Sequence, residues 1–207
     1  MPAPAKTPVF AIGVTGHRLN RLPEQGRPTV EAEIGGLLDL ALAASRAAPR
    51  PLRLTLVSGL AEGADRMAAE AALARGLALH AILPFEAGEY EKDFEEPGSK
   101  ASFRALLANA AGVEALPGHR ADAEAAYEAA GIAMLKASDI LIAVWDGGPS
   151  AGRGGTTEMV AAARARGLPV LWVDSAGARA AAPYDGTAKS CDDAIASAIA
   201  RVLGTSI

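Results

Sequence analysis

The 207-residue sequence is poor in cysteine, in aromatic residues and in long apolar runs. Cys191 is its single cysteine, so we expect neither an internal disulfide nor a cysteine-based zinc site, which fits a reduced cytoplasm. Aromatic residues make up only 4% of the chain, although 50% of it is hydrophobic. The composition therefore predicts a compact cytoplasmic domain whose core is built mainly from small side chains.

Signals for membranes and for nucleic acid are also lacking. No apolar run approaches the roughly 20 residues that span a bilayer. Residues 1–7 contain one lysine and no apolar stretch, so they are expected to form a disordered tail rather than a signal peptide. The 20 Lys and Arg against 24 Asp and Glu give a net charge of −4. Because phosphate backbones and anionic membranes attract basic surfaces, we expect no nucleic-acid partner and no membrane partner.

Apolar strand-like runs alternate with helical patterns along the chain. Strands are expected at 8–16, 52–59, 77–84, 139–147 and 168–174, with a shorter strand-like run at 113–118. Helices are expected at 29–47, 63–76, 101–110, 121–137, 156–167 and about 191–203. This alternation is typical of βαβ units, and continuous apolar strands are typical of a sheet covered on both faces. The sequence predicts a single α/β domain over residues 1–207, doubly wound and Rossmann-like, with a mainly parallel sheet of about five or more strands.

Residues 85–100 break this pattern and are expected to form an acidic, lid-like loop. Their charged residues are Glu86, Glu89, Glu91, Lys92, Asp93, Glu95, Glu96 and Lys100. The spacing matches no calcium-binding loop, so no metal site is expected. Tyr90 and Phe94 lie at helical spacing, and we expect them either to close over a ligand or to anchor the loop to the core.

Polar, glycine-bearing turns follow three of the expected strands. In open α/β sheets, ligands bind beyond the carboxyl ends of the strands. The candidate ligand-binding residues there are Thr15, Gly16, His17, Arg18, Ser58, Gly59, Gly63, Asp65, Asp146, Gly147, Gly154, Gly155, Thr156 and Glu158. The guanidinium of Arg18 is expected to pair with a phosphate and His17 to donate to a ligand oxygen. For the turn at 58–65, a tight connection with Asp65 as a first-turn acid is the structural alternative.

The stretch GRGGTTE, residues 152–158, points to a phosphate. Helix N-termini carry free N–H groups and a partial positive charge, and glycine lets an anion approach closely. Glu158 would repel a phosphate, so it is expected to contact ribose hydroxyls or to act in acid–base chemistry. The alternative is a flexible turn in which Thr156 caps the helix and Glu158 complements its dipole. Neither G-x-G-x-x-G nor the Walker pattern is present, so no cofactor is expected.

Three motifs resemble those of known bacterial and plant families. SGLAEGADRMAAEAALARG resembles the strand–turn–helix of bacterial DNA-processing proteins, and DGGPSAGRGGTTE resembles the P-G-G-x-G-T-x-x-E signature of the LONELY GUY phosphoribohydrolases. VTGHR resembles the start of a third, small bacterial group. On these motifs the chain is identified as a member of the SLOG superfamily of Rossmann-like nucleotide-binding domains, over about residues 9–174.

The resemblance implies a nucleotide or nucleotide-derived ligand at the carboxyl edge. It implies a phosphate on Gly154, Gly155 and Thr156, with Glu158 as the signature glutamate. Gly152 and Arg153 depart from the signature's proline and first glycine. Glu62 stands where the DNA-processing proteins tend to have a basic residue, which argues against single-stranded DNA.

Three functions follow as expectations. The first is a nucleotide-binding sensor or carrier, compatible with a homodimer and with a separate effector protein. The second is a phosphoribohydrolase that cleaves the N-glycosidic bond of a nucleoside monophosphate, with Glu158 as the catalytic carboxylate. The third is a purely structural or partner-binding domain.

Overall fold

The computed structural model describes residues 7–149, 153–184, 186 and 188–205, and the structural statements below concern those residues. The tail expected at residues 1–7 therefore lies outside the described residues, apart from its last position.

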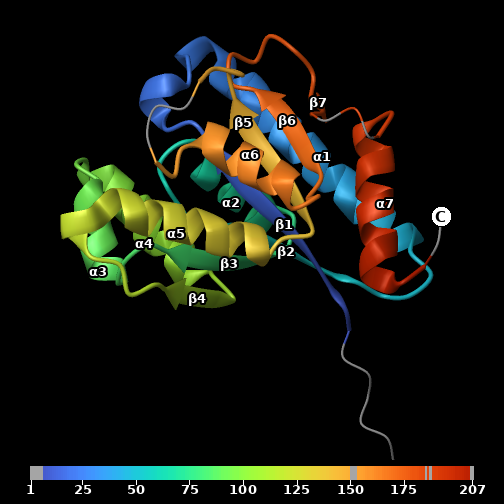
Figure 1. The fold of residues 1–207 in the computed structure, drawn as a ribbon, viewed down its shortest axis with the longest axis horizontal. Coiled ribbons are helices and arrows are strands. Elements are labelled where there is room, and N and C mark those ends of the chain that lie inside the picture. Colours follow the sequence, from blue (N-terminus) through green and yellow to red (C-terminus); the bar gives the residue numbers. More distant parts are fainter. Residues whose placement is uncertain (1–6, 150–152, 185, 187, 206–207) are drawn as a thin grey trace, which may run out of the picture.

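A seven-stranded sheet forms the centre of the molecule, in the order β4-β3-β2-β1-β5-β6-β7 (Figure 1). Neighbouring strands run parallel, except that β6 and β7 are antiparallel. This confirms the predicted α/β fold with a mainly parallel sheet. The strands are β1 (Val9–Gly16), β2 (Arg53–Ser58), β3 (Ala78–Leu83), β4 (Gly112–Ala115), β5 (Ile140–Trp145), β6 (Val170–Asp174) and β7 (Ala182–Pro183).

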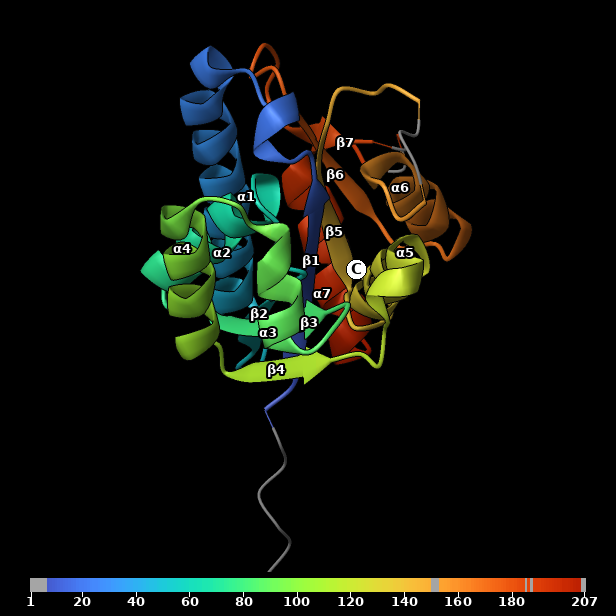
Figure 2. The ribbon, with the colours of Figure 1, turned by 90° about the vertical axis from the view of Figure 1, so that its left-hand side faces the viewer.

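Helices cover both faces of the sheet (Figures 1 and 2). Helices α1, α2 and α7 pack on one face, with α4 outside α2, whereas α5 and α6 pack on the other face. The helices are α1 (Arg27–Ala47), α2 (Ala64–Ala74), α3 (Ala87–Tyr90), α4 (Pro97–Ala108), α5 (Ala123–Lys136), α6 (Thr156–Ala165) and α7 (Cys191–Leu203). Single 3-10 turns occur at η1 (Leu19–Arg21), η2 (Glu24–Gly26), η3 (Glu91–Asp93) and η4 (Arg120–Asp122).

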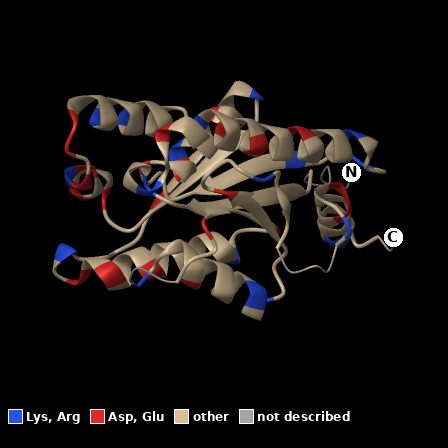
Figure 3. Cartoon of the chain, turned by 90° about the horizontal axis from the view of Figure 1, so that it is seen from above, with Lys and Arg blue, Asp and Glu red and all other residues tan. Residues whose placement is uncertain are grey.

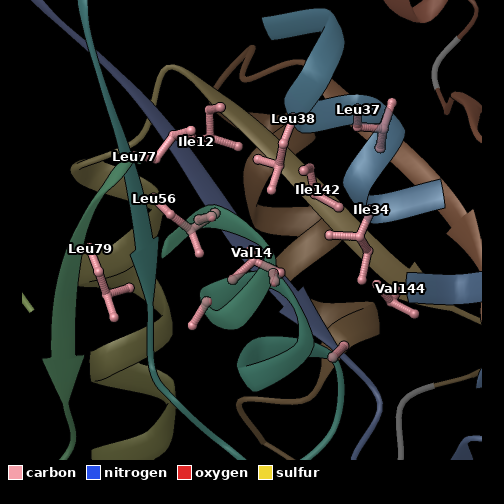
Figure 4. Packing of buried hydrophobic residues seen from close by; sticks show 14 of the residues in the cluster. Ile12, Val14, Ile34, Leu37, Leu38, Leu56, Leu77, Leu79, Ile142 and Val144 are labelled. Carbon is pink, nitrogen blue, oxygen red and sulfur yellow. The ribbon is translucent and has the colours of Figure 1, made fainter. Parts of the chain in front are cut away.

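The central strand β1 is buried on both faces, which is why its sequence reads as a continuous apolar run. Ile12 and Val14 belong to the cluster beneath α1, together with Leu38 and Ile142 (Figure 4). Ala11 belongs to the opposite cluster, beneath α5 and α6. Fully burying one side chain of the size of isoleucine or leucine stabilises a fold by about 1.5–3 kcal/mol, so these two clusters fix the position of β1 and of the turn that follows it.

Residues 85–100, which we expected to be a loop, are largely helical. They form α3, η3 and the beginning of α4. Tyr90 and Phe94 are buried, and their rings pack edge-to-face with centroids 5.1 Å apart. The two aromatic residues therefore anchor the segment to the core, and we call residues 85–100 the wall segment from here on. Its acidic composition predicted a loop because most of its carboxylates face solvent.

Charged residues lie mainly on the helices and on the connecting segments, and few lie on the strands (Figure 3). Among the described helices, none combines the length and the apolar character needed to cross a membrane.

Candidate functional site

A cleft of about 420 Å³ opens at the carboxyl end of β1, between the residues that follow β2 and β3 on one side and the turn before α6, which follows β5, on the other. From β1 the sheet grows in one direction through β2, β3 and β4, and the chain then returns to the other edge of β1 to add β5 and β6. The strand order therefore reverses between β1 and β5. Ligands of doubly wound sheets bind at such points. The cleft is lined by Val14, Thr15, Gly16, His17, Arg18, Asn20, Arg21, Gly59, Ala61, Asp65, Pro84, Tyr90, Tyr127, Ala130, Gly131, Met134, Arg153, Gly154, Gly155, Thr156 and Met159.

The turn after β1 is held against its neighbours through its backbone. The N–H of His17 donates to the carbonyl of Val144 at 3.0 Å, and the carbonyl of His17 accepts from the N–H of Ala64 at 3.2 Å. Gly63 adopts a φ of +94° directly beneath this turn, where a Cβ atom would lie 2.4 Å from the carbonyl oxygen of His17. Only glycine fits such a position, so Gly63 sets how closely α2 approaches the cleft.

The His17 side chain is buried at the edge of the cleft. Its Nε2 lies 3.6 Å from Oδ1 of Asp146, and its Nδ1 has no hydrogen-bond partner within the described part of the chain. Burial lowers the pKa of His17, the charge of Arg21 lowers it further, and Asp146 opposes both effects. His17 is therefore neutral at physiological pH, and it adds no positive charge to the cleft.

The Asp65 side chain stabilises the turn after β2 by hydrogen bonds to residues of that turn. Its Oδ2 accepts from the Ser58 hydroxyl at 3.2 Å and from the Gly59 N–H at 3.1 Å. Ser58 is fully buried, and its Oγ also accepts from the N–H of Leu60, which has a φ of +56°. The polar groups expected to bind a ligand here are thus satisfied by one another. This turn follows the structural alternative given above, with Asp65 as its organiser.

The pKa of Asp65 predicts how stability depends on pH. Burial raises this pKa to about 6, against the opposing hydrogen bonds of Ser58 and Gly59. Between about pH 4 and pH 6 the folded protein keeps a proton that the unfolded chain has released, so the free energy of unfolding falls as the pH rises through this window. The shift of about two units corresponds to roughly 3 kcal/mol. Urea unfolding from pH 4 to pH 7 measures this loss.

The matched variants are Asp65→Asn and Asp39→Asn. Asp65→Asn should remove the loss of stability between pH 4 and pH 6, because the amide does not titrate. Asp39 hydrogen-bonds to Arg75, which lowers its pKa, so Asp39→Asn should leave that loss in place. Identical pH profiles for Asp65→Asn and the unchanged protein would show that Asp65 titrates normally.

The turn before α6 is organised by Glu158. Gly154 has a φ of +77°, and its N–H donates to Oε2 of Glu158 at 2.7 Å. A Cβ atom on Gly154 would lie 2.8 Å from the backbone nitrogen of Glu128, so this turn packs tightly against α5. Glu158 does not line the cleft. The Glu158 carboxylate therefore accepts from an N–H group that we expected to bind a phosphate. Because Glu158 is engaged there and lies outside the cleft, the geometry does not favour the expected contact with ribose hydroxyls.

Three arginines give the cleft a positive local charge: Arg18, Arg21 and Arg153. Arg21 pairs with Asp146 at 3.0 Å, and Arg153 pairs with Glu128 at 2.6 Å. Arg18 is exposed and forms no ion pair with any described residue.

The pairs made by Arg21 and Arg153 are partly exposed, with between 39% and 57% of each side chain accessible to solvent. Exposed ion pairs contribute little to stability, so a bound anion can replace either carboxylate at small cost. Asp65 is the one acidic residue among those that line the cleft. The cleft is therefore suited to an anion although the whole chain is acidic.

The wall segment is fixed on one side of the cleft by Arg66. This buried guanidinium donates from Nε to the carbonyl of Leu60 at 3.1 Å and from Nη1 to the carbonyl of Ser99 at 2.9 Å. It also lies 4.2 Å from the ring centroid of Phe94, and the Ser99 hydroxyl donates to Glu62. Arg66 thus joins the β2 turn to the wall segment.

Asp93 fixes the other end of the wall segment. One carboxylate oxygen accepts from the Tyr127 hydroxyl at 2.5 Å, and the other accepts from Nη1 of Arg120 at 2.7 Å. The Asp93 side chain is only 7% exposed. Tyr90 then lines the cleft from α3, and Tyr127 lines it from α5.

Nine of the fourteen candidate residues line the cleft: Thr15, Gly16, His17, Arg18, Gly59, Asp65, Gly154, Gly155 and Thr156. Five do not: Ser58, Gly63, Asp146, Gly147 and Glu158. The sequence prediction missed Arg21, Tyr127 and Arg153 as lining residues. Arg21 was available as a second basic residue in the loop that contains Arg18. Tyr127 gave no signal, because it lies on a helix that only tertiary packing brings to the cleft. The described residues contain no group of three or more His, Cys, Asp or Glu placed to hold a metal ion.

Comparison with known proteins shows the fold. No protein-family model and no curated protein matches the sequence. DNA processing protein A from Streptococcus pneumoniae has a TM-score of 0.55 and 22% identity, over 79% of this chain and 50% of that chain. The chain thus spans about half the length of that protein.

Two further solved structures are similar. DNA processing protein A from Helicobacter pylori has a TM-score of 0.50 and 18% identity, over 83% of this chain and 70% of that chain. The Moco carrier protein from Chlamydomonas rheinhardtii covers 97% of this chain at 17% identity, but its TM-score of 0.48 supports no argument.

The prediction that excluded a nucleic-acid partner is wrong. The Helicobacter protein is described by its single-stranded DNA binding mode, so this fold is compatible with a nucleic-acid ligand. The exclusion failed because net charge sums over the whole surface, whereas binding depends on local charge, and three arginines gather at the cleft. The likeness to the two DNA-processing proteins confirms the fold: the chain has a Rossmann-like fold similar to theirs, and membership of the SLOG superfamily stays a prediction from the sequence.

Proposed function

We propose that the cleft binds a nucleotide or a nucleotide-derived small molecule, and that the protein acts as a sensor or carrier of this ligand. The observation that supports this most directly is the set of three arginines around a cleft at the strand-order reversal. Guanidinium groups form forked, charge-assisted hydrogen bonds with phosphate. The volume of about 420 Å³ lies within the range of about 300–1,000 Å³ that small-molecule sites occupy.

The lining of the cleft combines charged and apolar groups, which suits the phosphate and the base of a nucleotide. Its charged rim is formed by the arginines, and the turn before α6 adds the N-terminus of a helix. Its apolar part is lined by Val14, Ala130, Met134 and Met159. A ligand with a phosphate at one end and a planar, largely apolar group at the other end would satisfy both.

The hydrolase alternative remains a prediction from the sequence and gains no support from the geometry. It requires a carboxylate facing the glycosidic bond, but Glu158 lies outside the lining and is hydrogen-bonded to Gly154. Asp65 lines the cleft, but its carboxylate is held by the β2 turn.

Calorimetric titration with AMP tests the proposal. Arg153→Gln should weaken AMP binding by about 10- to 150-fold, because Arg153 lines the cleft beside the turn before α6 and a hydrogen bond to a charged group contributes about 1.5–3 kcal/mol. Arg104→Gln is the control, since Arg104 is an exposed arginine of α4 that pairs with Glu91 outside the cleft. Equal affinities for the unchanged protein, Arg153→Gln and Arg104→Gln would show that the phosphate does not use Arg153. Absence of AMP binding to the unchanged protein would overturn the proposal.

A further inference from the structure

We propose that Tyr127 and Arg18 form a stacking subsite for a planar heteroaromatic base within the cleft. This inference rests on the proposed function and adds the place and the chemistry of the ligand's base. Both residues line the cleft, and they approach it from different elements, the turn after β1 and the helix α5.

The ring of Tyr127 is held in a fixed orientation. Its hydroxyl donates to Oδ2 of Asp93 at 2.5 Å, and its ring packs against Phe85 in a T-shaped arrangement with centroids 5.7 Å apart. Burial raises the pKa of Tyr127 to about 12, and the hydrogen bond to Asp93 contributes in the same direction. The hydroxyl is therefore neutral and already engaged, so the ring contributes a π surface to the cleft rather than a polar group.

Arg18 lies over this ring, and its guanidinium forms no ion pair with a described residue. Its Cζ lies 6.0 Å from the Tyr127 ring centroid, at the outer limit for a cation–π contact. A base inserted between two planes needs two stacking intervals of roughly 3.4 Å each. Arg18 is exposed and has no ion pair among the described residues, so its side chain can move outward by the small additional distance.

The phosphate end of the cleft lies within reach of this subsite. A Cβ atom on Gly154 would lie 3.1 Å from the carbonyl carbon of Tyr127, so the turn before α6 packs directly on the residue whose ring forms the subsite. A ligand whose phosphate meets that turn and Arg153 can therefore extend its base along the Tyr127 ring. Base stacking on aromatic rings and on guanidinium planes accepts every base, because each base has a π face.

Two ligands that differ only in the base test the subsite: AMP and ribose 5-phosphate. Tyr127→Leu removes both the π surface and the hydroxyl. Tyr127→Phe removes only the hydroxyl, so it is the matched control. By calorimetry, the unchanged protein and Tyr127→Phe should prefer AMP. Tyr127→Leu should lose about 5- to 150-fold of AMP affinity, the range expected for one stacked base. Its affinity for ribose 5-phosphate should change less than twofold.

Fluorescence gives a second measurement that does not require Tyr127→Leu to fold. The 5′-monophosphate of 2-aminopurine riboside should be quenched when it binds to the unchanged protein and to Tyr127→Phe. Binding of the 2-aminopurine nucleotide without quenching would overturn the subsite. Equal losses of affinity for AMP and for ribose 5-phosphate in Tyr127→Leu would overturn it too. If the unchanged protein binds ribose 5-phosphate as tightly as AMP, the stacking subsite is wrong and the phosphate site stands. If it binds neither ligand, the proposed function is wrong as well.

Discussion

Replacing Gly63 by alanine is expected to lower the free energy of unfolding by about 3 kcal/mol or more. The residue has a φ of +94°, and the added Cβ would lie 2.4 Å from the His17 carbonyl oxygen and 2.9 Å from Cα of Arg18. With a ψ of −130°, this backbone conformation is one that only glycine adopts readily and costs an alanine about 1–3 kcal/mol, and overpacking against backbone adds typically 1–3 kcal/mol. Because Gly63 supports the turn that contains His17 and Arg18, AMP binding should weaken too. Urea unfolding and calorimetry measure the two effects.

Gly36 provides the matched control. It lies within α1, and a Cβ atom there would meet no atom within 4 Å. Gly36→Ala should therefore raise the free energy of unfolding by about 0.5–1 kcal/mol, since glycine weakens a helix interior. If both variants unfold within about 1 kcal/mol of the unchanged protein, the close approach of α2 to the β1 turn plays no part in stability.

Arg66→Ala is expected to cost about 3 kcal/mol or more, because it removes the hydrogen bonds from a buried charged donor to two backbone carbonyls, and each such bond contributes about 1.5–3 kcal/mol. The substitution would leave the carbonyls of Leu60 and Ser99 without their donor, and Glu62 without the nearby charge that Arg66 provides. It would also leave a cavity beside Phe94. The wall segment should become the first part of the molecule to open, which amide hydrogen exchange in residues 85–100 detects.

Arg104→Ala separates this effect from the loss of another arginine that contacts the wall segment, since Arg104 pairs with Glu91 from α4. Arg104 makes two hydrogen bonds to Glu91, but its side chain is 67% exposed, so its removal should leave stability and exchange rates unchanged. Similar losses in the two variants would mean that burial of Arg66 is not what matters.

The sheet could be predicted from the sequence because parallel strands buried on both faces read as uninterrupted apolar runs. β5 is an example, since every residue of Ile140–Trp145 is buried. β7 was not predicted because it has two residues, Ala182 and Pro183, and pairs with β6 only through tertiary contact. α3 was missed because its four residues are mostly polar or small, and Tyr90 alone fixes them to the core.

The site was predicted in part for a related reason. Residues that follow a strand directly, such as Thr15 and Gly59, reach the carboxyl edge wherever the strand is placed. Tyr127 and Arg153 reach the cleft only through the packing of α5 against α6, which no local pattern encodes. We expected Glu158 to contact a ribose because the sequence argument considered its interaction with a ligand and not with the neighbouring backbone. In the free molecule the N–H of Gly154, four residues earlier, competes for the same carboxylate.

The central position of β1 has a consequence for how the chain folds during synthesis. β1 pairs with β2 across the connection that contains α1, but its other edge pairs with β5, and the contact between Ala11 and Asp139 spans 128 residues. At translation rates of about 5–20 residues per second, that edge remains unpaired for roughly 6–26 s. The cleft is built on this seam, so a nascent chain acquires the site only once β5 has emerged. Folding on the ribosome should therefore be slow, because it is limited by this late pairing. Until β5 arrives, the free edge of β1 can pair with another strand.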